Sequence, residues 1–443
     1  MIEGIRQLWD KKKYSQVIKL PHMSSGGRHP DFQEVQGLGS LLYVHAALWQ
    51  GDHVRITVVK KLNVPVCTAL CVLWYSSDQN AIPYFAQAVV RDLESYNFEN
   101  ACGYIKCILK AGKNETGEIP VLVSLVDGSD IESGLKITLP IEDTRIHTDD
   151  KKENISIGKK IDIKIKKTWA VEFTECLPTM YGFGNAGMLV EKLEMSKLLG
   201  AGRVVLYNTS IEPNVDAVLR MYTQEFAAGR EKLEVMVHSW DLPPITMHYW
   251  GQIAAMEDCL YRYKWTSRYM VFTDMDELII PFHHASWSEL IADREKLNPG
   301  SVAFKIRSTV MRKDHSSPAK GLETEAFHYR SEVLRVTDRD DYIWPEVDRT
   351  KVFVNPAKIE SVEVHGVYEG YGPIDNVPPD QALLYHYRWP LRKSCTDIRD
   401  TRVADKYGQR LIQGLKAAWA KLKDVPSGWN PTNETERAQC RNI

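Results

Sequence analysis

The sequence has no apolar run of about 18 residues, the length that a membrane-spanning helix needs. Its nearest approach, residues 64–75, is shorter and holds a proline and two cysteines, so we interpret it as strands. We therefore expect no spanning helix and no signal peptide in these 443 residues, and we expect any membrane anchor to lie upstream of Met1. A strong charge imbalance is also missing: the net charge is −2, which gives no indication of a nucleic-acid surface.

The cysteine spacing typical of zinc sites is absent as well. None of the eight cysteines belongs to a Cys-x-x-Cys pair, but their even number fits disulfides, for which the spacing fixes no pairing. Chance would give roughly two Asn-x-Ser/Thr sequons in a chain of this length. The sequence has sequons at Asn114, Asn154, Asn208 and Asn433. Together these features favour the secretory pathway over a chain with buried free thiols.

The chain does contain enough apolar sequence for two folded domains. Hydrophobic residues make up 44% and charged residues 26%, the balance of a soluble folded protein, and 443 residues exceed one ordinary core. Residues 1–165 alternate short apolar runs with turn signals, which predicts a smaller, β-rich, sandwich-like accessory domain. We expect residues 166–443 to form the catalytic domain and to end in a helical segment that starts near Asp397.

From Lys166 the pattern changes to strands that alternate with helices. This alternation predicts an α/β fold with a Rossmann-like, mostly parallel sheet that is covered by helices on both faces. Gly200 and Gly229 are placed to end two of the helices. The predicted strands are 168–176, 203–207, 233–237 and 269–272, and the predicted helices are 185–199, 215–226 and 249–263.

The strongest chemical signal is the run Asp274-Met-Asp276-Glu277, which follows the fourth strand. Carboxylates just past a buried strand lie at the edge where an open sheet binds ligands. Two acids one residue apart can hold a divalent cation, which in turn can hold a diphosphate. A phosphatase motif of the Asp-x-Asp-x-Thr kind would need Thr or Val at position 278, but the residue there is Leu278. A pair of acids that only caps a helix would not need the second apolar run that follows Glu277. The run therefore predicts a metal–diphosphate site and a phosphorylated donor.

A cation held by two acids needs further ligands. Manganese accepts oxygen and imidazole, and His365 and His386 each follow a short apolar run, so we expect one of them to be the third ligand. The basic side chains of Arg388, Arg392 and Lys393 could neutralise charge on a leaving diphosphate. Their other interpretation is a solvent-facing basic turn.

Several longer motifs resemble glycosyltransferase family 92. The resemblance covers about 170–400 and is carried by 199–207, 246–252, 258–262, 272–281, 364–367 and 386–388. It implies a GT-A-type, metal-dependent, inverting galactosyltransferase that uses UDP-galactose and Mn²⁺. It also implies β1,4 transfer onto a terminal galactose or fucose of a glycan, in the Golgi lumen, by a type II membrane protein.

The same resemblance assigns roles to individual residues. It implies that Asp274 faces the ribose and the metal, and that Asp276 ligates Mn²⁺. His386 is then the first choice for the histidine ligand and His365 the second. Two further residues are implied to border the donor site, Gln252 and Asp258.

Inversion is a single displacement in which a carboxylate removes the proton of the acceptor hydroxyl. Glu346 and Asp348, followed by Asp341, are candidates for this base because they lie between the acids and the histidines in the sequence. Trp344 could stack on an acceptor sugar or belong to the core. A sugar-1-phosphate nucleotidyltransferase remains an alternative, although 177–184 lack a convincing basic pyrophosphate loop. A secreted, non-catalytic glycan-binding protein is a second alternative. Such a protein would be expected to have lost Asp274 and Asp276, and both are present.

Overall fold

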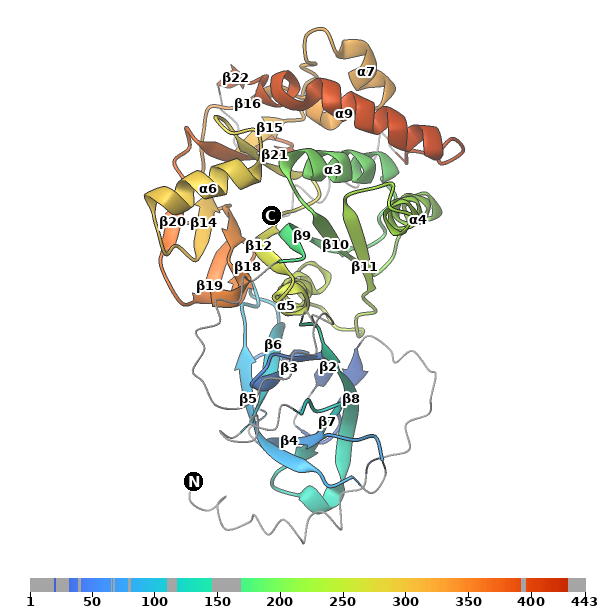
Figure 1. Cartoon of the computed structure of the whole chain (residues 1–443), viewed down its shortest axis with the longest axis vertical. Helices are drawn as coiled ribbons and strands as arrows, with labels where there is room; N and C mark the ends of the chain where they lie inside the picture. Colours follow the sequence, from blue (N-terminus) through green and yellow to red (C-terminus); the bar gives the residue numbers. More distant parts are fainter. Residues whose placement is uncertain are drawn as a thin grey trace, which may run out of the picture. The chain divides into compact units, whose positions relative to one another are not determined.

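The chain forms two compact units (Figure 1). The structure, a computed structural model, describes residues 20, 32–38, 41–64, 66, 68–78, 81–109, 118–145, 169–391 and 396–428. The N-terminal unit comprises Met1–Asp162 and Trp240–Trp265, and the α/β unit comprises Ile163–Ser239 and Thr266–Ile443. The first boundary lies close to the one expected at 165, whereas the segment Trp240–Trp265 was expected in the catalytic domain.

The N-terminal unit is built on one eight-stranded sheet with the order β1-β2-β3-β6-β5-β4-β7-β8. An additional parallel pairing of β2 with β8 joins the sheet to itself, so β2 to β8 close into a barrel. The prediction of a sandwich was therefore wrong, because alternating hydrophobicity locates strands but does not say which strands pair. Closure leaves fewer unpaired strand edges than two open sheets would. The strands are β1 (Gln33–Glu34), β2 (Leu42–Trp49), β3 (His53–Lys61), β4 (Ala69–Trp74), β5 (Tyr84–Asp92), β6 (Asn100–Ile108), β7 (Leu122–Asp127) and β8 (Leu135–Asp143).

Helix α5 (Gln252–Tyr263) belongs to this N-terminal unit, where it contacts β2, β3 and β6. Arg55 of β3 forms a buried ion pair with Glu257 at 2.5 Å, and its guanidinium lies 3.8 Å from the ring centre of Tyr261. The periodicity of the sequence predicts this helix correctly. It does not say which sheet the helix covers, because an apolar face fits any apolar surface of the right shape.

A disulfide joins Cys71 of β4 to Cys107 of β6. The sequence predicted disulfides without a pairing, and this bond provides one, while Cys102 is a buried free thiol.

Among the sequons, Asn208 ends strand β10 (Arg203–Asn208). The other sequons and three cysteines lie outside the described residues: Asn114, Asn154, Asn433, Cys67, Cys395 and Cys440.

The α/β unit contains a seven-stranded sheet with the order β11-β10-β9-β12-β17-β14-β20. Every strand except β17 runs in the same direction, so the sheet is mostly parallel. Strands β10 and β12 are almost entirely buried and read as continuous apolar runs, as expected for strands covered on both sides. Besides β10, the strands are β9 (Val171–Met180), β11 (Glu234–Ser239), β12 (Ser267–Phe272), β14 (Ala303–Ile306), β17 (Lys351–Val354) and β20 (Ile374–Asn376).

The strand order reverses beside β9. The chain runs outward from β9 to β10 and β11 and then returns to form β12 on the other side of β9. The carboxyl ends of β9 and β12 are neighbours, since Cys176 pairs with Phe272. Ligands of open α/β sheets bind outside the carboxyl ends at such a reversal. The acidic run from Asp274 follows β12 at this point.

A second, five-stranded sheet has the order β13-β21-β15-β16-β22 and continues from the acidic run. Its strands are β13 (Glu277–Pro281), β15 (Ser308–Arg312), β16 (Asp338–Asp340), β21 (Ala382–Arg388) and β22 (Asp397–Arg399). A separate hairpin is formed by β18 (Ile359–Glu363) and β19 (Gly366–Gly370).

The helices of the α/β unit begin and end close to the predicted residues. Asn185 caps α3 by accepting the N–H of Met188, and Gly200 ends it at φ +113°, a conformation that favours glycine. The C-terminal helix begins later than expected because residues 397–399 pair as β22. The helices are α3 (Ala186–Leu199), α4 (Pro213–Ala227), α6 (Trp287–Leu297), α7 (Glu323–His328), α8 (Glu332–Arg335) and α9 (Arg402–Lys421).

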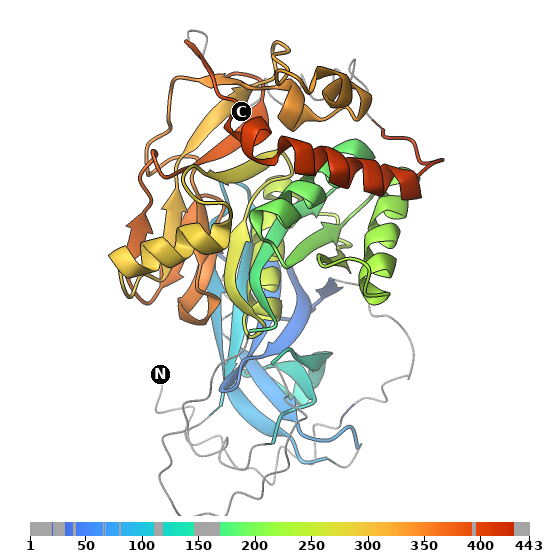
Figure 2. The same cartoon turned by 45° about the horizontal axis from the view of Figure 1, so that its top comes forward.

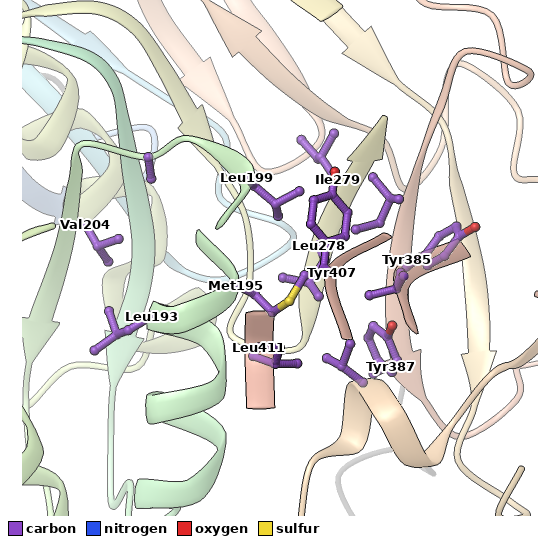
Figure 3. Packing of buried hydrophobic residues seen from close by; sticks show 14 of the residues in the cluster. Leu193, Met195, Leu199, Val204, Leu278, Ile279, Tyr385, Tyr387, Tyr407 and Leu411 are labelled. Atoms are coloured by element: carbon purple, nitrogen blue, oxygen red, sulfur yellow. The ribbon is translucent and has the colours of Figure 1, made fainter. Parts of the chain in front are cut away.

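Helices α3 and α9 pack along one another in both views (Figures 1 and 2). Figure 3 shows part of the core: Met195 and Leu199 of α3 lie toward Leu278 of β13, beside Tyr407 and Leu411 of α9. This core fixes the start of β13 and therefore the acids just before it. Over the described ranges, no helix is both long and apolar enough to cross a membrane.

Candidate functional site

A tight turn between β12 and β13 carries the three acids. The N–H of Glu277 donates to the carbonyl of Asp274 at 3.2 Å, and the Glu277 Oε2 accepts the N–H of Asp274 at 2.8 Å. The turn is thus closed by a backbone bond and by a side-chain bond. The side chains of Asp274 and Asp276 are each 29% exposed, whereas that of Glu277 is 3% exposed. The turn presents two carboxylates to solvent and keeps the third inside.

Lys351, the first residue of β17, is buried against this turn. Its Nζ lies 3.1 Å from the Asp274 Oδ2 and 3.3 Å from the Glu277 Oε2. Burial lowers the pKa of Lys351, but the two carboxylates outweigh burial and hold that pKa above its usual value. Lys351 is therefore charged and neutralises part of the acidic turn. The sequence analysis did not identify it.

His386 of β21 lies opposite Glu277 in the β13–β21 pair. Its Nε2 is 3.3 Å from the Asp276 Oδ2, and its Nδ1 is 3.4 Å from the Glu277 Oε1. Burial lowers the pKa of His386, but the charge of Asp276 outweighs it and the net shift is upward. Burial likewise raises the pKa of Asp276, and His386 reverses that shift to a value well below the usual range. The structure brings the first-choice histidine to Asp276, while its role as a metal ligand stays a prediction.

His365 lies in the turn between β18 and β19. Its Nδ1 is 3.4 Å from the Thr350 carbonyl, and the Thr350 hydroxyl donates to the His365 carbonyl at 2.5 Å. Burial, followed by the charge of Lys351, lowers the pKa of His365 to about 4, while Asp274 opposes this shift. His365 is thus neutral at neutral pH and lies on the Lys351 side of the acids. This position makes it the weaker choice as the partner of Asp276.

Two basic side chains also lower the pKa of Asp276. After burial and His386, Lys313 and then Arg388 contribute to the lowered pKa of Asp276. The Nε of Arg388 is buried and, among the described residues, has no hydrogen-bond partner. Arg388 is thus close enough to Asp276 to affect its pKa, while its role toward a diphosphate stays a prediction. The other two predicted basic residues, Arg392 and Lys393, lie outside the described residues.

A buried polar network supports the turn from behind. The Nζ of Lys192 donates to the Glu277 carbonyl at 2.6 Å and to the Thr273 hydroxyl at 3.0 Å, and it pairs with Glu175 at 2.9 Å. The Ser196 hydroxyl donates to the other oxygen of Glu175 at 2.5 Å. The sequence analysis missed these residues. Little in the sequence indicates a buried role for Lys192 and Ser196, because each has a charged residue next to it in the helix.

A cavity lies between α3 and the turn. Methionine side chains form much of its wall, and Asp276 is one of its polar residues. The lining includes Met188, Met195, Met275, Asp276, Glu191 and Tyr387.

Gln252 and Asp258 were predicted to border the donor. Both lie on α5, which belongs to the N-terminal unit, and both are buried. The two carboxylate oxygens of Asp258 accept bonds from Arg262, each at 2.9 Å. Both carboxylate oxygens of Asp258 therefore already accept hydrogen bonds from a residue of the same helix. A donor-binding role for these two residues stays a prediction.

The candidate bases lie on the loop between β16 and β17. They are Asp341 and Glu346, which are exposed, and Asp348, whose side chain is 46% exposed. The loop is stabilised by the guanidinium of Arg349, which lies 4.7 Å from a ring centre of Trp344, and it ends at Lys351. Because Lys351 contacts Asp274, the end of this loop is held beside the acids. The choice among the three carboxylates stays a prediction, and so does sugar stacking by Trp344.

The donor atoms around Asp276 fit a divalent cation. In the part of the chain that the structure describes, no group of three or more His, Cys, Asp or Glu side chains is arranged to hold a metal ion. A carboxylate and an imidazole that face one another are nevertheless suitable ligands for manganese. Cations that bind nucleotides commonly use one or two carboxylates and take their other ligands from phosphates and water. Asp276 and His386 meet that requirement, and Asp274 is held beside them by Lys351.

The fold and this site define an α/β protein with an acidic ligand site at the reversal of its strand order. Residues 171–437 match the family model described as Glycosyltransferase family 92. This match covers more than half of the chain, and the chain belongs to glycosyltransferase family 92. The longer motifs of the sequence predicted this membership.

Two relatives from Caenorhabditis elegans show the likeness in sequence. The chain is 32% identical over 111 residues to Glycosyltransferase family 92 protein F13G3.3. This aligned segment is 24% of this chain and 22% of the relative. The chain is also 27% identical over 107 residues to Beta-1,4-galactosyltransferase galt-1, and the aligned segment is 24% of each of the two chains. The matched segments thus span about a quarter of each relative. Among solved structures, a mannosyltransferase from Pyrobaculum calidifontis in complex with GDP-Man and Mn²⁺ matches 62% of this chain and 84% of its own, with 13% identity and a TM-score of 0.28.

Proposed function

We propose that this chain is a GT-A-type, inverting, metal-dependent glycosyltransferase that moves galactose from UDP-galactose to a glycan. The observation that carries the proposal is the Asp276–His386 pair, at 3.3 Å, at the ligand edge of the sheet in a chain of family 92. The choice of galactose is supported by the name of the relative galt-1, a β-1,4-galactosyltransferase. We propose the same linkage here, onto a terminal galactose or fucose.

The proposed site has residues for the cation, the ribose and the diphosphate of the donor. Asp276 and His386 would hold the cation, which when bound supplies positive charge to the diphosphate. Asp274, which pairs with Lys351, would accept hydrogen bonds from the ribose. Arg388 would donate to the diphosphate as negative charge grows on it, and its buried Nε, which has no partner among the described residues, supports this role.

The reaction is a single displacement. The acceptor oxygen forms a bond to the anomeric carbon while the bond from that carbon to the diphosphate oxygen breaks. The electron pair of the broken bond leaves with UDP. The proton of the acceptor hydroxyl passes to a carboxylate, for which Asp348, Glu346 and Asp341 are the candidates on the loop that ends at Lys351.

We propose the Golgi lumen as the site of action. The Cys71–Cys107 disulfide supports this proposal because disulfides persist in oxidising compartments. Glycan ends, the proposed acceptors, are also exposed to transferases there.

The direct test is release of UDP from a panel of UDP-sugars and GDP-mannose, with Mn²⁺ and with EDTA. We expect turnover with UDP-galactose and Mn²⁺, and its loss with EDTA. A second panel of glycans that end in galactose, fucose or N-acetylglucosamine would identify the acceptor by mass. Metal-independent turnover would contradict the role of Asp276, and preference for another donor sugar would contradict galactosyl transfer.

A further inference from the structure

Glu277 has no task in the proposed function, although it belongs to the acidic run. Its side chain is 3% exposed, compared with 29% for Asp274 and for Asp276. A carboxylate buried to this degree is remote from a donor in solution. Any effect of Glu277 on the site therefore has to pass through its neighbours.

The two oxygens of Glu277 face different neighbours. Oε2 accepts the backbone N–H of Asp274 at 2.8 Å and lies 3.3 Å from the Lys351 Nζ. Oε1 lies 3.4 Å from the Nδ1 of His386. The backbone fixes this second contact, because Glu277 and His386 are register partners in the antiparallel pair β13–β21. One side chain thus joins the turn that carries the aspartates to the strand that carries the histidine.

The other ring nitrogen of His386, Nε2, faces the Asp276 Oδ2 at 3.3 Å. A histidine that binds a metal through one nitrogen commonly donates its other N–H to a carboxylate, which fixes the tautomer and the orientation of the ring. Glu277 occupies the place of that carboxylate.

We propose that Glu277 is a positioning residue, which holds the His386 ring through Nδ1 so that Nε2 and Asp276 face the same cation. Its other oxygen holds the backbone of Asp274, so both halves of the site keep one arrangement. The inference rests on the divalent cation of the proposed function. Glu277 itself contacts neither the cation nor the sugar in this arrangement.

The test measures Mn²⁺ binding to the full chain without donor, by calorimetry. Removal of such an outer carboxylate typically weakens metal binding about 10- to 100-fold, and we expect Glu277→Gln to fall in this range. The matched control is Asp375→Asn, which alters a buried carboxylate of the same unit that pairs with Arg294 at 2.8 Å. We expect the control to lower the melting temperature and to leave Mn²⁺ affinity unchanged.

A double-mutant cycle separates positioning from a general loss of structure. In a His386→Gln background, titrated to high Mn²⁺ concentrations, Glu277→Gln should weaken binding less than it does in the wild type, since the part of its effect that passes through His386 is already lost. Fully additive losses would overturn the inference. If Glu277→Gln does not fold, Glu277→Asp serves in the same cycle, because it keeps the charge but shortens the reach to Nδ1.

The two proposals fail in different ways. Wild-type Mn²⁺ affinity in Glu277→Gln would overturn this inference alone and leave the proposed function standing. No Mn²⁺ binding by the unmodified chain, with or without UDP, would overturn the metal-dependent function and this inference together.

Discussion

The Nε2 of His386 lies 3.3 Å from the Oδ2 of Asp276, although the two residues come from distant parts of the sequence. Strand β21 brings them together, because it pairs with β13 directly after the acidic turn. The contact between Asp276 and His386 is therefore a product of strand register. Changes at either residue should alter metal use more than they alter folding.

Replacement of Asp276 tests the centre of the site. We expect Asp276→Ala to reduce UDP release from UDP-galactose by at least about 100-fold, since it removes charge stabilisation at the diphosphate. The melting temperature should change little, because the side chain is partly exposed. Asp293→Ala, which removes an acid of α6, is the control and should keep activity. Near-normal turnover of Asp276→Ala would refute the site.

Separate replacement of the two histidines tests which one serves the cation. His386→Ala should raise the Mn²⁺ concentration needed for half-maximal turnover about 10-fold or more, as expected for loss of a ligand or its support. His365→Ala should leave this concentration nearly unchanged, because the hydrogen-bond partners of His365 are on Thr350. Turnover would be measured over a Mn²⁺ series for both variants. Equal, mild effects would mean that neither histidine is a ligand.

Replacement of Lys351 tests the charge balance of the turn. Lys351→Met leaves the buried Glu277 carboxylate and Asp274 without their cation, and removal of one partner of a buried pair costs about 3–5 kcal/mol. Urea denaturation would measure this loss. The control is Arg220→Ala, in an exposed pair with Asp216, for which a change below about 0.5 kcal/mol is expected. Equal losses in both variants would contradict the role given to Lys351.

The buried carboxyl of Glu191 predicts a pH dependence of stability. Burial raises its pKa to about 7, although the Ser331 hydroxyl and two backbone N–H groups at the start of α8 donate to it. The folded state thus binds the proton more tightly than the unfolded state, whose pKa is near 4.5. The free energy of unfolding should therefore fall between about pH 4.5 and pH 7, by up to about 3 kcal/mol from this group.

Glu191→Gln removes this titration. Its unfolding free energy should change less than that of the wild type between pH 5 and pH 8, and the variant should be relatively more stable at pH 8. Urea titrations at both pH values measure the difference between the two proteins, so other titrating groups cancel. Parallel pH profiles would contradict a buried carboxyl that titrates near neutrality.

Removal of the disulfide tests the N-terminal barrel. The Cys71–Cys107 bond closes a sequence separation of 36 residues, for which loop entropy gives about 4 kcal/mol of stabilisation. The double variant Cys71→Ala, Cys107→Ala should lose a large part of this, as measured by thermal unfolding. Cys102→Ala, which removes a buried free thiol, is the control for lost packing. Equal losses would show that packing dominates.

The sequence predicts local structure in the α/β unit well, because local signals determine it. Apolar runs located β9 to β12, and Asn185 and Gly200 marked the ends of α3. The position of Asp274 and Asp276 after a buried strand was enough to predict an acidic site at a sheet edge. The longer motifs then identified the family.

Pairing between distant segments could not be predicted from local signals. The contact of Lys351 with Asp274 could not be predicted, because only the pairing of β12 with β17 brings the two residues together. The alternation in the N-terminal unit located strands but could not show that β8 pairs with β2. The choice between His365 and His386 depended on register in the same way.

The membership of α5 in the N-terminal unit has a consequence for dissecting the molecule. The chain leaves the α/β unit at Trp240 and returns to it at Thr266, so the barrel is completed by a segment from the middle of the sequence. A fragment that starts at residue 166 would carry α5 without the barrel strands and would expose its apolar face to water. A fragment that stops at residue 165 would lack the partner of Arg55. Each unit can be isolated intact only by excising or grafting the segment Trp240–Trp265, because a single cut divides one of them.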